Sequence, residues 1–157
     1  MDNYEIKFLA QKFRKALDKA FQPHNGERYP FDRFPKECCH DVCDLFGQFL
    51  FERNELVWKA FGKYYPDNDE SPYSHVWIKL EDGTVVDLTG DQYKDNPTML
   101  NYNNPCYVGR PNQLHQLFLS DEFRCEPYYG INNYVNDIVP ERLWAIYNKV
   151  MQYFEEN

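Results

Sequence analysis

Hydrophobic residues recur at steps of three and four in three parts of the chain, and this spacing predicts amphipathic helices. The first is expected over residues 2–21, where Asp2 and Glu5 have the spacing of a capping box. The second is expected from about residue 39 to residue 52, and a last helix opens at Pro140, which suits a first helical turn. The three hydrophobic stripes consist of Ile6, Leu9, Phe13, Ala16, Leu17, Ala20 and Phe21, of Val42, Leu45, Phe46, Phe49 and Leu50, and of Leu143, Ile146, Tyr147, Val150, Met151 and Phe154.

Alternation of hydrophobic and polar residues indicates strands in the middle of the chain. One strand is expected over residues 56–65, and two alternating runs within residues 74–89 flank Asp82-Gly83, a strong hairpin signal. Residues 90–105 are rich in Asn, Asp and Pro and are expected to form a long loop, while short strands near residues 106–109 are weakly marked. The pattern therefore predicts an α+β fold in which helices flank a small antiparallel sheet.

The length of the hairpin loop decides which side chains share a face of the sheet. A two-residue loop at Asp82-Gly83 would place Ile78 opposite Asp87 and a carboxylate among hydrophobic side chains. A three-residue loop over residues 81–83, with its glycine in the left-handed conformation, instead places Ile78 opposite Val86. One face of the hairpin is then almost wholly hydrophobic, so the three-residue loop is favoured.

In this register the second face of the hairpin brings a histidine and an aspartate together. The face carries His75, Trp77, Lys79, Val85, Asp87 and Thr89. His75 lies diagonal to Asp87, at a separation that an imidazole–carboxylate hydrogen bond can span. The alternative is a solvated polar face on which the two side chains do not interact.

Composition and charge limit the classes of function. The chain has 157 residues, without an internal repeat or a linker, and is expected to form a single domain over residues 1–157. Its 17 Lys and Arg residues against 25 Asp and Glu residues give a net charge of −8, which argues against nucleic acid as a partner. No hydrophobic run reaches the roughly 18 residues of a membrane span, and residues 1–10 lack the apolar stretch of a signal peptide. We therefore expect a cytoplasmic protein.

The cysteines carry the first sign of chemistry. There are five, an odd number, so a disulfide framework is not expected. Cys38 and Cys39 lie where the second helix begins, and the free N–H groups and dipole of a helix start favour a thiolate and stabilise an oxyanion. The helical pattern does not choose between these two. With His75 as base and Asp87 to orient it, either one completes a Cys-His-Asp triad.

The order of these residues along the chain resembles the papain-like and transglutaminase-like superfamily. More narrowly, Phe34-Pro35-Lys-Glu-Cys-Cys39, Ser74-His75-Val-Trp77 and Asp87-Leu-Thr-Gly-Asp91-Gln92 are similar to a pattern of uncharacterised bacterial and phage proteins. That pattern reads Phe-Pro-x-Gly-x-Cys-x-x-x-Ser, then His-Ala-Trp-Leu-Glu, then Asp-Ile-Thr-Ala-Asp-Gln-Phe. The resemblance covers about residues 34–93 and extends weakly to residues 115–118.

The resemblance implies a papain-like domain with Cys39 as nucleophile at the start of a helix, His75 as base and Asp87 as orienting carboxylate. Gln92 and Trp77 are candidate binding residues, and Gln92 is a candidate for polarising an oxyanion.

The chain departs from the pattern at two positions. The glycine of the pattern is Glu37 here and its serine is Cys43. A negative charge at Glu37 would raise the pKa of the neighbouring thiol unless this side chain points to solvent. Cys43, one helical turn further along, is expected to be a buried structural thiol.

The resemblance therefore implies a cysteine-dependent hydrolase or acyl or amide transferase. Members of the superfamily act as peptidases, amidases, deamidases or transglutaminase-like enzymes through a thioester, so a peptide, a protein or another amide-bearing molecule is the expected substrate. No cofactor is expected, because such chemistry uses side chains alone.

Two alternatives stay open at this point. The first is a zinc site built from Cys38, Cys39, His40 and Cys43, with Cys106 and His115 as distant ligands. The second is a non-catalytic protein-binding module that retains the fold and presents tyrosines on its surface. The tyrosines in expected loops are Tyr64, Tyr65, Tyr128, Tyr129 and Tyr134.

Overall fold

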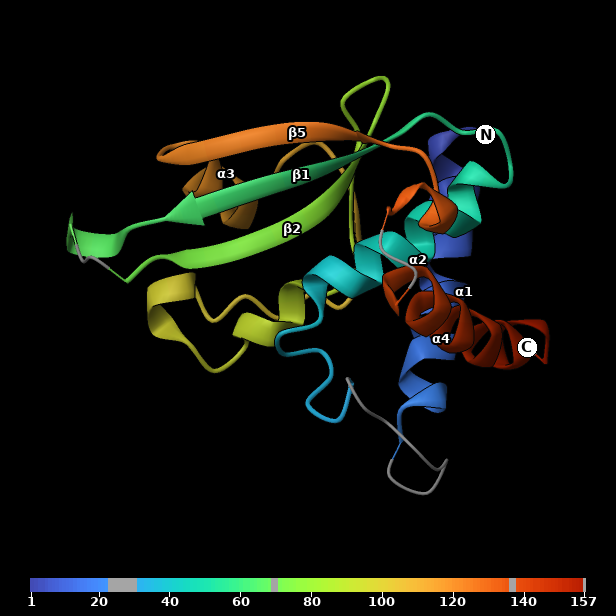
Figure 1. Ribbon diagram of the computed structural model, residues 1–157. Helices are drawn as coiled ribbons and strands as arrows, with labels where there is room; N and C mark the ends of the chain where they lie inside the picture. Colours follow the sequence, from blue (N-terminus) through green and yellow to red (C-terminus); the bar gives the residue numbers. More distant parts are fainter. Residues whose placement is uncertain (23–30, 69–70, 136–137, 157) are drawn as a thin grey trace.

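The computed structural model describes residues 1–22, 31–68, 71–135 and 138–156, and these residues form four α-helices and one five-stranded sheet (Figure 1). The strands follow the order β4-β3-β2-β1-β5, and each neighbouring pair is antiparallel. The predicted α+β class is confirmed. The helices are α1 (Asn3–Ala20), α2 (Cys39–Phe51), α3 (Gln113–Leu119) and α4 (Ile138–Glu155), and the strands are β1 (Val57–Tyr64), β2 (Tyr73–Leu80), β3 (Val85–Asp87), β4 (Tyr107–Gly109) and β5 (Glu122–Tyr128).

The three helices predicted from hydrophobic spacing are all present. Asp2 caps α1 by accepting a hydrogen bond from the Glu5 amide, and the Glu5 side chain accepts from the Asp2 amide, which completes the expected capping box. Helix α2 begins at Cys39, as expected, and α4 begins two residues before Pro140. None of the helices in the described residues is long and apolar enough to cross a membrane.

The hairpin between β2 and β3 has the predicted three-residue loop. Ile78 pairs with Val86, the Leu80 amide donates to the Thr84 carbonyl at 2.8 Å, and Gly83 has a φ of +87°. That positive φ is the left-handed conformation that a bulged turn requires and that glycine adopts without strain. The register that places His75 and Asp87 on one face is therefore confirmed.

The sheet separates two hydrophobic clusters, and alternate residues of β2 contribute to each. Val76 and Ile78 belong to the large cluster formed with α1, α2 and α4. Trp77 belongs to a smaller cluster with Leu114 and Phe118 of α3, which lies apart from the other three helices (Figure 1). His75 and Asp87 are therefore on the face that α3 covers, opposite the face on which α2 lies.

Helix α3 and strand β5 were not predicted. Helix α3 is seven residues long, too short for a clear hydrophobic period, and its start is marked by the capping side chain of Asn112. Strand β5 is an edge strand whose residues are mostly exposed, so its faces differ little in polarity. The expected loop over residues 90–105 contains two 3-10 helices, Gly90–Tyr93 and Pro97–Met99.

A buried ion pair attaches the segment after β3 to α1. The Arg14 guanidinium forms two hydrogen bonds with the Asp91 carboxylate, from Nη1 at 2.7 Å and from Nη2 at 2.9 Å. Nη1 also donates to the carbonyl oxygens of Leu88 at 2.8 Å and Pro105 at 3.1 Å. Arg14 is only 7% exposed, so these bonds are shielded from water. They hold the 3-10 helix Gly90–Tyr93, which carries Gln92, in a defined position.

Substituting Arg14→Met is expected to lower the free energy of unfolding by about 3 kcal/mol, because the Asp91 carboxylate then stays buried without its partner. Urea denaturation measures this change. The exposed Arg33–Glu37 pair is the matched control, and Arg33→Gln is expected to change the free energy of unfolding by about 0.5 kcal/mol or less. Equal effects of the two substitutions would contradict the structural role of Arg14.

Candidate active site

Cys39 is the first residue of α2. The first main-chain hydrogen bond of this helix runs from the Val42 amide to the Cys38 carbonyl at 2.9 Å, so the amide groups of residues 39–41 point out of the helix end. Donors at a helix start stabilise a negative charge placed beside them. The Cys39 sulfur therefore lies where a thiolate and an oxyanion are both favoured.

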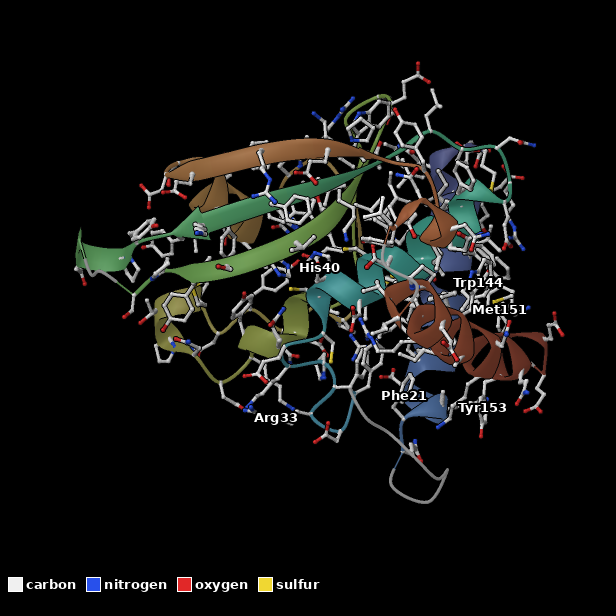
Figure 2. The ribbon with its side chains drawn as sticks, viewed as in Figure 1. Phe21, Arg33, His40, Trp144, Met151 and Tyr153 are labelled. Carbon is white, nitrogen blue, oxygen red and sulfur yellow. The ribbon has the colours of Figure 1, made fainter. Side chains whose placement is uncertain are left out.

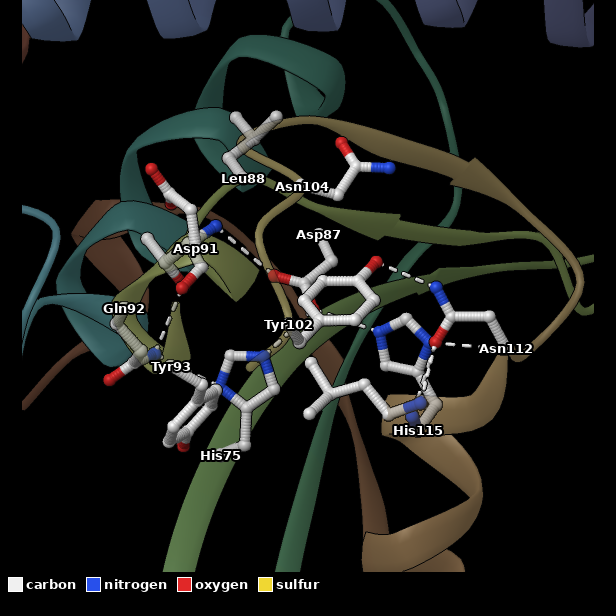
Figure 3. A network of polar contacts seen from close by, with 12 residues as sticks. His75, Asp87, Leu88, Asp91, Gln92, Tyr93, Tyr102, Asn104, Asn112 and His115 are labelled. Atoms are coloured by element: carbon white, nitrogen blue, oxygen red, sulfur yellow. Dashed lines mark hydrogen bonds and ion pairs between the residues drawn. The ribbon is translucent and has the colours of Figure 1, made fainter. Parts of the chain in front are cut away.

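His75 and Asp87 form a buried hydrogen-bonded pair. His75 Nε2 is 2.7 Å from Asp87 Oδ2, and each residue is 1% exposed (Figure 3). The other carboxylate oxygen, Oδ1, accepts from the Thr89 amide at 3.1 Å. The His–Asp pair predicted from the hairpin register is thus present, and it is not a solvated polar face.

Cys39 meets His75 although the two come from opposite sides of the sheet. Strand β3 pairs with β2 at Ile78 and Lys79, and the chain turns away after Asp87 into the 3-10 helix Gly90–Tyr93. Where β3 no longer pairs with β2, the Cys39 thiol makes hydrogen bonds with the Val76 backbone and the His75 side chain. Because His75 uses Nε2 for Asp87, the contact with the cysteine falls to Nδ1, which also lies 3.3 Å from Gln92 Nε2.

The charges of the three groups support one another. Burial raises the pKa of Cys39, but hydrogen bonds from His75 and the Val76 backbone and the charge of His75 outweigh burial, so the pKa falls below its ordinary value. Burial lowers the pKa of His75, whereas Asp87 and Cys39 raise it, with a net rise to about 10. Burial would raise the pKa of Asp87, but the two histidines that bind it hold that pKa well below its usual range. This arrangement favours a thiolate, an imidazolium and a carboxylate.

The other four thiols have a raised pKa. Burial raises the pKa of Cys38 and of Cys106 to about 12, and it also raises the pKa of Cys43 and Cys125. The Cys38 sulfur donates to the Lys36 carbonyl at 3.1 Å, away from His75. The choice between Cys38 and Cys39, left open by the helical pattern, therefore falls on Cys39. Cys43 is buried, as expected.

The ligands of the alternative zinc site do not form a cluster. The described residues contain two groups of possible metal ligands, and neither includes a cysteine. The groups are His75, Asp87 and His115, and His40, Asp41 and Asp44. In the second group a lysine ammonium, Lys59 Nζ, already lies 2.6 Å from Asp44 Oδ1 and 3.1 Å from His40 Nδ1. The cysteine zinc site is therefore not supported by the geometry.

His115 is the residue of the site whose role was not predicted. Its Nε2 atom lies 2.8 Å from Asp87 Oδ2, and the residue is completely buried. The sequence carries a signal for its local position, since it stands three residues after the helix cap Asn112. No strand register links α3 to β3, however, so the contact with Asp87 could not be derived from the pattern.

The two candidate binding residues lie on different sides of His75. Gln92 Nε2 is 3.3 Å from His75 Nδ1 and donates to the Thr89 carbonyl at 3.1 Å, so this amide lies beside the His75 ring. Trp77 is 2% exposed, and its ring lies 5.7 Å from the His75 ring and 4.8 Å from the His115 ring. The buried Trp77 ring therefore packs against both histidine rings.

Glu37 directs its charge into solvent. Its side chain is 72% exposed and pairs with Arg33 at 3.0 Å. Its backbone has a φ of +62°, a conformation that glycine adopts easily and that explains why glycine suits this position. Glu37 therefore points to solvent, and the thiol whose pKa its charge helps to raise is that of Cys38.

Cavities border His75 and Gln92. One of about 410 Å³ is lined by His75, Val76 and the rings of Phe61 and Phe123. Another, of about 610 Å³, is lined by residues that include Gln92 and Tyr93. Ser74 borders both cavities.

His40 lines the first of these cavities and a third one, of about 210 Å³. It follows Cys39 directly and lies at the end of α2 that faces the sheet (Figure 2). Its Nδ1 atom lies 3.1 Å from Nζ of buried Lys59 and 3.5 Å from Asp44 Oδ2. His40 is therefore a polar side chain on the border of two cavities.

The tyrosines proposed for a binding surface are divided between surface and interior. Tyr129 is 59% exposed, whereas Tyr128 is buried and its hydroxyl donates to the Asp44 carbonyl at 2.8 Å. The Tyr134 hydroxyl donates to the Asp44 carboxylate at 2.6 Å. Two of the five thus have an internal role.

Comparisons with protein-family models, with curated proteins and with solved structures found no match.

Near neutral pH, iodoacetamide is expected to alkylate Cys39 before the other four cysteines, because thiolate is the reactive form and the pKa of Cys39 is lowered. Site-resolved mass spectrometry over a pH series measures the rate at each thiol, and the rate at Cys39 should rise at a lower pH than at a free cysteine. Glu37→Gln is the control and is expected to leave this profile unchanged. Uniform labelling of the five thiols would contradict the assignment.

Proposed function

We propose that this protein is a cysteine-dependent hydrolase or acyl transferase of the papain-like or transglutaminase-like type. Cys39 is the nucleophile, His75 the general acid and base, and Asp87 the carboxylate that orients His75. The substrate is a peptide, a protein or another molecule that carries an amide. The observation that carries the proposal is the contact of Cys39 with a histidine whose Nε2 atom lies 2.7 Å from a buried aspartate.

In the first half of the reaction the Cys39 thiolate attacks the substrate carbonyl carbon, and a carbon–sulfur bond forms. The carbonyl oxygen takes up the negative charge, and the amide groups at the start of α2 donate hydrogen bonds to it. The imidazolium of His75 gives its Nδ1 proton to the leaving nitrogen as the carbon–nitrogen bond breaks. The products of this half are a free amine or ammonia and a thioester on Cys39.

In the second half water or an amine attacks the thioester carbonyl carbon. His75, now neutral at Nδ1, accepts the proton of the attacking group, and the carbon–sulfur bond breaks. The thiolate and the imidazolium are restored. Water gives hydrolysis or, when ammonia was the first leaving group, deamidation. An amine gives transfer.

The surroundings of the three residues support a catalytic role. A cavity lined by His75 and another lined by Gln92 give room for a substrate beside the site. His40 adds a polar side chain to the cavity that His75 lines. A protein-binding module has no need for a thiol of lowered pKa beside a buried His–Asp pair, since such groups serve nucleophilic chemistry. A Cys at a helix start in an α+β fold also agrees with the proposed superfamily.

Incubation with p-nitrophenyl acetate is expected to place one acetyl group on Cys39 as a hydroxylamine-sensitive thioester. His75→Ala should slow this acylation by about 100-fold or more, because a general base and the partner of the thiolate are lost. Intact-mass spectrometry and peptide mapping follow the acetyl group. Cys125→Ser is the control and should acylate like the wild type. Acylation that is spread over several thiols, or a His75→Ala rate equal to that of the wild type, would refute the proposal.

The products distinguish hydrolysis, deamidation and transfer to an amine. Wild-type protein and a Cys39→Ala variant are incubated with a proteome-derived peptide library and an excess of a labelled primary amine. New peptide termini indicate hydrolysis, conversion of glutamine to glutamate indicates deamidation, and incorporation of the amine indicates transfer. Products that also arise with Cys39→Ala do not come from this site.

A further inference from the structure

Asp87 lies between two imidazole rings (Figure 3). Its Oδ2 atom is 2.7 Å from His75 Nε2 and 2.8 Å from His115 Nε2, so one carboxylate oxygen serves both histidines. An ionised carboxylate only accepts hydrogen bonds, and each Nε2 atom must therefore carry a hydrogen. A Cys-His-Asp triad needs one of these donors, and the second one calls for an explanation.

The hydrogen of His115 is fixed by the start of its own helix. His115 Nδ1 accepts from the Asn112 amide at 3.2 Å, so the ring hydrogen is on Nε2 and points to Asp87. The Asn112 side chain accepts from the Leu114 and His115 amides, at 3.0 Å and 3.3 Å. The His115 ring packs against the rings of Trp77 and Tyr107, at 4.8 Å and 5.7 Å. Capping and packing together hold His115 as a ready donor.

The hydrogen bond from His115 stabilises the negative charge of Asp87, which is only 1% exposed and so has little contact with water. A buried charge is unfavourable unless fixed hydrogen bonds replace its water. During the proposed reaction His75 changes charge twice, whereas the hydrogen bond from His115 stays in place. Asp87 is then kept ionised and in one orientation throughout, and so is the His75 ring that binds it.

We propose that His115 is a positioning residue that acts through Asp87 and extends the site to Cys39, His75, Asp87 and His115. This inference rests on the proposed function of the first three residues. A side chain that merely filled the core would need the volume of His115 but not its hydrogen-bond donor, and this difference makes the inference testable.

The test compares His115→Gln with His115→Leu. The side-chain amide of glutamine places an N–H group near the position of Nε2, whereas leucine fills the space without a donor. The readout is the pH dependence of Cys39 alkylation by iodoacetamide, with thermal melting to verify folding. His115→Leu is expected to slow alkylation near neutral pH by about tenfold and to raise the pH at which the rate increases, and His115→Gln should restore most of the rate.

Few other groups near His75 and Asp87 titrate in this range. The phenols that face them are Tyr93 and Tyr102; burial raises the pKa of Tyr102 to about 12 and that of Tyr93 further. The thiols of Cys43 and Cys106 also have a pKa raised by burial. Because these groups, and His40 beside Cys39, are the same in the wild type and both variants, a difference between the alkylation profiles reports on the change at position 115. A wild-type profile in His115→Leu, or a His115→Gln variant as slow as His115→Leu, would overturn the inference.

A second measurement needs no variant at position 115. In nitrogen-15 spectra of the wild type, His115 is expected to carry a hydrogen on Nε2. An Nε2 atom without a hydrogen would overturn the inference even if both variants failed to fold. If wild-type Cys39 is not selectively alkylated and His75→Ala has no effect, the proposed function itself fails. If Cys39 is selectively alkylated and His75→Ala slows the reaction, but His115→Leu leaves the alkylation profile unchanged, only the proposed role of His115 fails.

Discussion

The ionised carboxylate of Asp87, buried beneath the sheet, is the constraint on which the arrangement of the site depends. Such a charge persists in an interior only when fixed donors surround it, and Asp87 accepts hydrogen bonds from His75, His115 and the Thr89 amide. These donors come from β2, from α3 and from the turn after β3. Satisfying one carboxylate therefore requires that three separate parts of the chain be in place.

The fold and much of the site follow from local patterns. Helix spacing predicted α1, α2 and α4, and the hairpin between β2 and β3 has strong alternation and a turn glycine, Gly83, at a positive φ. Because strand pairing has a period of two, the register alone placed His75 and Asp87 on one face. Cys39 was assigned by a resemblance, and the contact of its thiol with His75 agrees with that assignment.

The parts that were not predicted depend on contacts between distant segments. His115 reaches Asp87 across 28 positions of the chain, and Arg14 reaches Asp91 across 77. Neither contact has a local period, because one joins α3 to the end of β3 and the other joins α1 to the 3-10 helix after β3, and the packed core sets both placements. The edge strand β5 was missed for a related reason, since its exposed residues show little contrast between its two faces. Long-range polar contacts are thus where pattern analysis of this chain ends.

The loop of the β2–β3 hairpin has a consequence for how this chain tolerates change. His75 and Asp87 are 12 positions apart, and the three residues at the tip determine which way the second strand faces. A slip of the pairing by one residue would turn the carboxylate toward α1, α2 and α4 and bring a hydrophobic side chain to the histidine. Natural variants of this hairpin that keep the pair should therefore keep the partners of Ile78 and Lys79 on β3, whatever the length of the loop.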